Sequence, residues 1–119
     1  MMLNFVGKNI YLACGATHMN AGIDALAAVV QSSFNLTPAS DAIFIFCNRE
    51  KNKLKILEWD ADGFWLHYKR LERGRFPWPE RSGGEKTMAL SVRELEYLLG
   101  GSKLKMRFDR IGYSGRPVA

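Results

Sequence analysis

Residues 69–81 read KRLERGRFPWPER and gather the side chains best suited to hold a polyanion. Five basic groups, two aromatic rings and two prolines lie in this stretch, against two glutamates. Guanidinium groups make paired hydrogen bonds to phosphates, and indole rings stack on unpaired bases. Pro77 and Pro79 hold the residue before each in an extended conformation. The stretch therefore predicts Phe76 and Trp78 as rigid, outward-facing rings beside arginines.

The positive charge is concentrated in the later part of the chain. The net charge is +5, of which residues 1–48 carry −1, residues 49–81 carry +3 and residues 82–119 carry +3. A pI near 9.4 with clustered Lys and Arg favours a nucleic-acid partner. We predict that the nucleic-acid-binding residues are Arg49, Lys51, Lys53, Lys55, Lys69, Arg70, Arg73, Arg75, Trp78 and Arg81.

Apolar periodicity and turn signals predict the elements that position these side chains. Residues 9–14 (NIYLAC) and 42–47 (AIFIFC) are typical of buried strands. Between them, apolar residues recur from Ile23 to Phe34 at helical spacing, and Thr17 or Asn20 is expected to cap this helix. The strand-like segments 53–59 and 64–70 flank the hairpin signal DADG.

After a link at 81–87 (RSGGEKT), Ser91 and Glu94 form a capping-box pattern at the start of a second helix. These patterns predict an α+β fold, a single domain in which an antiparallel β-meander of about three to five strands packs against two helices. Residues 1–101 are expected to form the compact domain, and residues 102–119 a C-terminal basic strand or tail.

Alternation along the hairpin assigns its side chains to two faces. With the apolar sets turned toward the helices, the remaining face carries Lys53, Lys55, Lys69, His67, Trp59 and Trp65. Such a face suits single-stranded or deformed nucleic acid. An alternative stays open: the lysines prevent edge-to-edge aggregation, and the two tryptophans pair across the hairpin.

The aromatic residues also have a second interpretation as protein-binding anchors. Trp and Arg are the residue types most enriched at the centres of interfaces. On this interpretation Phe76, Trp78 and Trp65 bind a protein partner.

The residue types do not favour catalysis or metal binding. His18 and His67 have no nucleophile or carboxylate partner in sequence, and no phosphate-binding loop is found. Residues 58–63 imitate the start of a calcium loop, but its twelfth position is Lys69 instead of a carboxylate. The prediction is a non-catalytic protein without cofactor or metal.

Cys14 and Cys47 lie in apolar surroundings and are expected to be buried free thiols, as in the reducing cytoplasm. No run approaches the roughly 18 apolar residues that a membrane helix needs. A cytoplasmic protein with no membrane partner is therefore expected.

Three blocks of the sequence resemble a known family. They are IYLACGATHMNAGIDALAAVVQ, FIFCNREKNKLKILEWDADGFWLHYKRLERGRFPWP and LSVRELEYLLGG, which together span roughly residues 10–101. In order and spacing they resemble the TnpB-type accessory proteins, encoded by the second open reading frame of bacterial insertion sequences of the sixty-six family. The resemblance implies a non-catalytic protein that supports DNA transposition beside a separate transposase. Insertion-sequence ends and that transposase are the two expected partners, and the resemblance does not decide which of them the protein contacts directly.

The chain departs from that family at the start of the first helix. Family members usually read T-D-M-R-K-G there, whereas residues 17–22 read T-H-M-N-A-G. The acidic residue and both basic residues are replaced, so the resemblance implies the central basic and aromatic block as the site.

Overall fold

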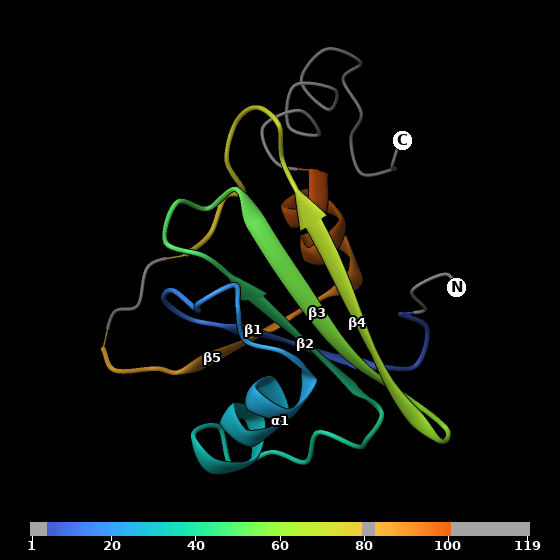
Figure 1. Ribbon diagram of the computed structural model, residues 1–119. Helices are drawn as coiled ribbons and strands as arrows, with labels where there is room; N and C mark the ends of the chain where they lie inside the picture. The colour runs from blue at the N-terminus through green and yellow to red at the C-terminus, as the bar shows by residue number, and fades with distance from the viewer. Residues whose placement is uncertain (1–4, 80–82, 101–119) are drawn as a thin grey trace.

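One five-stranded sheet organises the residues that the computed structural model describes, 5–79 and 83–100 (Figure 1). Its strands lie in the order β4-β3-β2-β1-β5. The labelled elements are β1 (Asn9–Ala13), α1 (Ile23–Ser32), β2 (Ala42–Cys47), β3 (Lys53–Asp60), β4 (Gly63–Arg70) and β5 (Thr87–Leu90). A second helix occupies residues 92–100. The predicted α+β class is confirmed.

The consecutive strands β2, β3 and β4 form the predicted antiparallel meander. The sheet as a whole is mixed, because α1 returns the chain to the starting end of β1 and β2 therefore runs parallel to it. β5 pairs antiparallel with the other side of β1. The interpretation of residues 81–87 purely as a link is wrong at its end, since Thr87 already belongs to β5.

Helices cover both faces of the sheet and create two cores (Figure 1). Leu26 and Val30 of α1 pack with Phe44 and Phe46 of β2 and with Leu57 of β3. On the opposite face, the second helix contributes its buried side chains to a core with β1, β2 and β3: Leu95 and Leu98 meet Ile10, Leu12, Ile43, Ile45, Leu54 and Ile56. Central strands covered on both faces explain why AIFIFC is apolar at every position.

The two helices begin in different ways. The capping box predicted for the second helix is confirmed: Ser91 N donates to Glu94 Oε1 at 2.8 Å, and Glu94 N donates to Ser91 Oγ at 3.1 Å. The predicted cap of α1 by Thr17 or Asn20 is wrong, because Gly22 is its N-cap and no side chain bonds there.

The predicted C-terminal strand or tail, residues 102–119, lies outside the described residues. Within 5–79 and 83–100, no helix has the length and apolarity to cross a bilayer.

Candidate nucleic-acid interface

Two basic segments that are separate in sequence meet at one end of the sheet. The loop that follows β4 lies beside the β2–β3 turn (Figure 1). Leu71 N donates to Asn52 O and Phe76 N donates to Lys51 O, both at 2.7 Å. We call the resulting surface the basic end; its residues are Arg49, Lys51, Lys53, Arg70, Arg73 and Arg75.

Asn48 gives the β2–β3 turn a fixed shape. Its Oδ1 accepts hydrogen bonds from the backbone N–H of Asn52 at 3.1 Å and of Lys53 at 3.0 Å. Its Nδ2 donates to Asn52 Oδ1 at 2.8 Å and to Glu50 Oε1 at 3.2 Å. Asn side chains stabilise turns in this way. The turn therefore presents Arg49 from an ordered backbone.

The basic end has few counter-charges. Its six cations are accompanied by the carboxylates of Glu50 and Glu72. Arg70 Nε donates to Glu72 Oε2 at 2.9 Å, and this hydrogen bond and charge raise the pKa of Arg70. Arg49, Arg73 and Arg75 are exposed, and their side chains form no hydrogen bond or ion pair with the described residues. These three guanidinium groups are available to an anionic ligand.

Two predicted phosphate-binding lysines form hydrogen bonds within the protein. Lys55 Nζ donates to the carbonyls of Met19 at 2.6 Å and Ala21 at 2.8 Å, just before α1. Lys69 Nζ donates to Leu99 O at 2.7 Å in the second helix. Ammonium groups near the last carbonyls of a helix also complement its dipole. Both lysines fix neighbouring elements to the hairpin.

The predicted basic and aromatic face of the hairpin is wrong, because the cross-strand register divides it. Lys55 lies opposite Tyr68 and Trp59 opposite Phe64, on the α1 side of the sheet. Trp65, His67 and Lys69 lie opposite Glu58, Ile56 and Leu54, on the other side. The alternative, a Trp59–Trp65 pair, is not formed either: Trp59 meets the ring of Phe64 edge to face at 4.9 Å, and Trp65 stacks on His67 at 6.3 Å.

The outward orientation predicted for Phe76 and Trp78 is contradicted by their burial. Phe76 is 1% exposed and Trp78 is 6% exposed, both inside the core of the second helix. Trp78 Nε1 donates to Ala13 O at 3.1 Å. Neither ring can stack on a base or anchor a protein partner from this position. Their role is to attach the arginine-bearing loop to the sheet.

Trp65, the third predicted partner-binding aromatic, remains accessible at 43% exposure. Its Nε1 donates to Asp60 Oδ2 at 3.0 Å across the hairpin. Arg81, the last predicted nucleic-acid-binding residue, lies outside the described residues.

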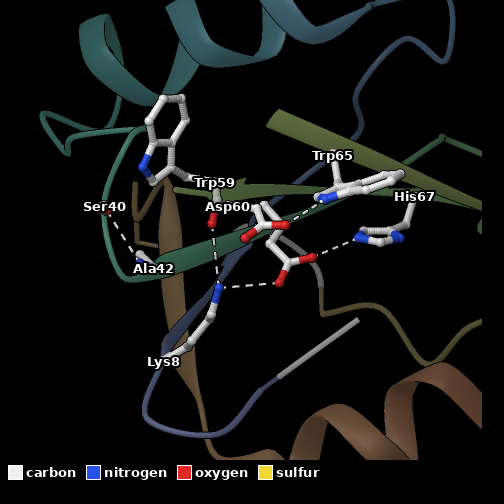
Figure 2. A network of polar contacts seen from close by, with 8 residues as sticks. Lys8, Ser40, Ala42, Trp59, Asp60, Trp65 and His67 are labelled. Atoms are coloured by element: carbon white, nitrogen blue, oxygen red, sulfur yellow. Dashed lines mark hydrogen bonds and ion pairs between the residues drawn. The ribbon is translucent and has the colours of Figure 1, made fainter. Parts of the chain in front are cut away.

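A buried charged cluster at the opposite end of the sheet escaped the sequence interpretation (Figure 2). The Glu58 carboxylate is 1% exposed; its Oε2 lies 3.2 Å from Lys8 Nζ and its Oε1 lies 2.8 Å from His67 Nε2. Lys8 Nζ also approaches Trp59 O at 3.5 Å. One signal could have revealed the cluster: Glu58 continues the inward-facing series of Leu54 and Ile56 on β3.

The two histidines lie at separate places in the fold. His67 has a carboxylate partner in Glu58, contrary to expectation, but the contacts of this pair include no Ser, Thr or Cys nucleophile among the described residues. His18 lines a cleft beside Arg49 and Lys53, at the site of the departure from the resembled family. Within 5–79 and 83–100, no three His, Cys, Asp or Glu side chains gather as a metal site would require.

Neither Cys14 nor Cys47 forms a disulfide, as predicted, although Cys14 is only partly buried. Cys47 is fully buried, and desolvation raises the pKa of its thiol to about 12. A neutral thiol is a poor nucleophile. Cys47 is therefore a packing residue.

Comparison with known proteins identifies the family to which this chain belongs. The chain matches the family described as IS66 Orf2 like protein over residues 8–108 and belongs to that family. It is a family of transposition accessory proteins and is not a known class of enzyme. The chain is 40% identical over 97 residues to the uncharacterized protein y4hO of Sinorhizobium fredii (strain NBRC 101917 / NGR234), covering 80% of this chain and 83% of the relative.

A second relative from the same strain, the uncharacterized protein y4jC, is 30% identical over 95 residues and covers 80% of each chain. No solved structure shows a significant match to the chain. The region that matches the family, residues 8–108, includes the basic end and the buried Glu58 cluster.

Proposed function

We propose that this protein is a non-catalytic, cytoplasmic accessory factor that binds the DNA ends of its insertion sequence through the basic end. One observation carries the proposal: two separate segments converge to place exposed guanidinium groups on one surface, with few carboxylates among them. Family membership supplies the context of transposition. Strand cleavage and joining are left to a separate transposase.

The burial of Phe76 and Trp78 sets the kind of contact that the basic end offers. With the rings of Phe76 and Trp78 buried, its six basic residues supply charge and hydrogen-bond donors, which suit phosphates. The expected ligand is duplex DNA held by its backbone. Sequence selectivity then depends on other contacts, including those of the transposase.

Replacing Arg49, Arg73 and Arg75 together by alanine tests this function. Removing one phosphate-binding cation lowers the slope of log affinity against log salt by about 0.9, so the triple variant is expected to have a slope smaller by between about 2 and 3. The measurement is a fluorescence-anisotropy titration of an end-derived duplex between about 50 and 200 mM salt.

Arg93→Ala is the control, since Arg93 is an exposed cation of the second helix and is not one of the residues of the basic end. It should leave the slope nearly unchanged. Absence of wild-type binding at the lowest salt, or an unchanged slope in the triple variant, would contradict DNA binding by this surface.

A second candidate function is docking of the transposase without DNA contact, supported by a largely apolar cleft of about 480 Å³. The cleft lies between β5, the second helix and the loop that follows β4. Its lining includes Pro77, Pro79, Met88, Leu90, Tyr97 and Leu98. Phe76 and Trp78 direct their rings inward and leave the prolines to line the cleft. An apolar segment of the partner fits this surface better than a charged one.

Met88→Glu tests the second candidate by placing a charge in the cleft, where Met88 is 43% exposed. The variant is expected to capture the cognate transposase about tenfold or more less well, the loss typical of an interface anchor. Capture by the wild type is expected to survive nuclease treatment. Ala28→Glu, on the exposed side of α1, is the control. Loss of wild-type capture on adding nuclease would contradict direct docking.

A further inference from the structure

Among residues 5–79 and 83–100, one edge of the sheet is long and has no paired strand. β4 spans Gly63–Arg70 and pairs with β3 on one side; no strand of the described residues pairs with its other side. On an edge strand, alternate residues direct their backbone N–H and C=O groups outward, where they form a template for another strand. Proteins usually shorten or interrupt such edges, but β4 is eight residues long and contains no proline.

The two ends of β4 carry opposite charges. Asp60, the last residue of β3, and Asp62, in the turn, precede it, and its own last residues are Lys69 and Arg70. Asp62 and Arg70 are both exposed. An antiparallel copy of the same strand would set the acidic end of each against the basic end of the other. A parallel copy would set like charges together.

We propose that β4 pairs with β4 of a second copy of this chain, antiparallel and centred on Leu66. A twofold axis perpendicular to the sheet keeps each face continuous, so directly opposite residues must both be odd-numbered or both even-numbered. Centring on Leu66 sets Asp62 opposite the partner's Arg70. Centring on His67 instead would set Asp62 opposite the partner's Glu72, so charge selects the first register.

This register also covers the two exposed aromatic residues of β4. Tyr68 is 52% exposed and Trp65 is 43% exposed. Tyr68 comes to lie opposite the partner's Phe64 on one face, and Trp65 opposite the partner's His67 on the other. Directly opposite aromatic pairs are among the stabilising cross-strand combinations. Charge and exposed rings, two independent features, thus point to the same pairing.

A charge-swap experiment tests the pairing without DNA and independently of the proposed function. The full chain is expected to be a dimer in sedimentation equilibrium. Asp62→Lys sets like charges opposite each other at two symmetry-related positions and should weaken the dimer on the order of tenfold. Arg70→Glu should do the same, and the double variant D62K/R70E should recover most of the loss.

Glu96→Lys, an exposed change of the same sign on the second helix, is the matched control for Asp62→Lys and should leave the dimer intact. A full chain that stays monomeric at about 100 μM, well above the usual range for specific complexes, would overturn the proposal. So would a dimer that neither single variant weakens, because another surface would then hold it. Protection of β4 amides from hydrogen exchange in a monomer would show that the chain covers this edge itself.

A cross-link distinguishes the register. Cα atoms opposite each other on antiparallel strands are about 4.5–5.5 Å apart, within the range of a disulfide. Leu66→Cys should therefore form an intermolecular disulfide under mild oxidation. Tyr68→Cys, whose partner copy lies four residues away along the strand, should not. Cross-linking at 68 and not at 66 would overturn this register.

Discussion

Trp78→Ala is expected to lower the free energy of unfolding by about 3–5 kcal/mol, the cost of removing a large aromatic ring from a packed core. Trp78 is 6% exposed and packs with Phe76 in the core of the second helix. The variant also removes the donor to Ala13 O, which joins the arginine-bearing loop to β1. Denaturant unfolding followed by circular dichroism measures the loss without depending on tryptophan fluorescence.

Two comparisons define what the ring does. Trp78→Phe keeps most of the apolar volume and loses the hydrogen bond, so its expected cost is smaller, about 1–2 kcal/mol. Trp65→Ala, at a 43% exposed position, should cost less than Trp78→Ala. If Trp78→Ala instead kept full stability and reduced only DNA affinity, the ring would be acting as a stacking platform and its burial would be wrong.

Lys8→Met is expected to cost about 2–4 kcal/mol, because it leaves the buried Glu58 carboxylate with only the hydrogen bond to His67 among the side-chain contacts described for it. Breaking one side of a buried ion pair exposes the desolvation cost that the pair had offset. The partial exposure of the Lys8 side chain, 16%, places the effect at the lower part of the usual range. Denaturant unfolding followed by circular dichroism measures this loss of stability.

The double variant K8M/E58M isolates the interaction. Removing both charged groups removes the desolvation cost, so the double variant should be more stable than Lys8→Met alone by about 1 kcal/mol or more. His67 can turn to water, since its side chain is 22% exposed. Lys86→Met, an exposed lysine, is the control and should stay within about 0.5 kcal/mol. Equal stability of the single and double variants would contradict a paired, buried Glu58.

The sequence predicted the elements whose signals are local. β2, β3 and β4 alternate or are wholly apolar and are separated by turn residues, so the meander could be predicted. The capping box also lies within four residues. β5 was missed because its four residues, TMAL, show no clear alternation. They form a strand because they pair with β1, which is distant in sequence.

The errors at the candidate site have one physical cause: burial and register are set by partners distant in sequence. Arginines on both sides of FPWP suggested an exposed loop. The rings of Phe76 and Trp78 are instead buried, because they pack against the apolar side chains of the second helix. Alternation shows which residues of one strand share a face, but it does not show which face of β3 lies on the same side as which face of β4. The β3–β4 register decides this, and the prediction from sequence combined the two faces wrongly. The arginines themselves could be predicted as surface residues, since guanidinium groups are rarely buried unless paired.

The pairing of β1 with β5 has a consequence for synthesis of the protein. Ile10 lies opposite Leu90, so one edge of β1 stays open until nearly all of the described chain has left the ribosome. Contacts between such distant residues also slow folding. Nascent chains that stop before Thr87 would expose that edge to neighbouring polypeptides, which favours aggregation.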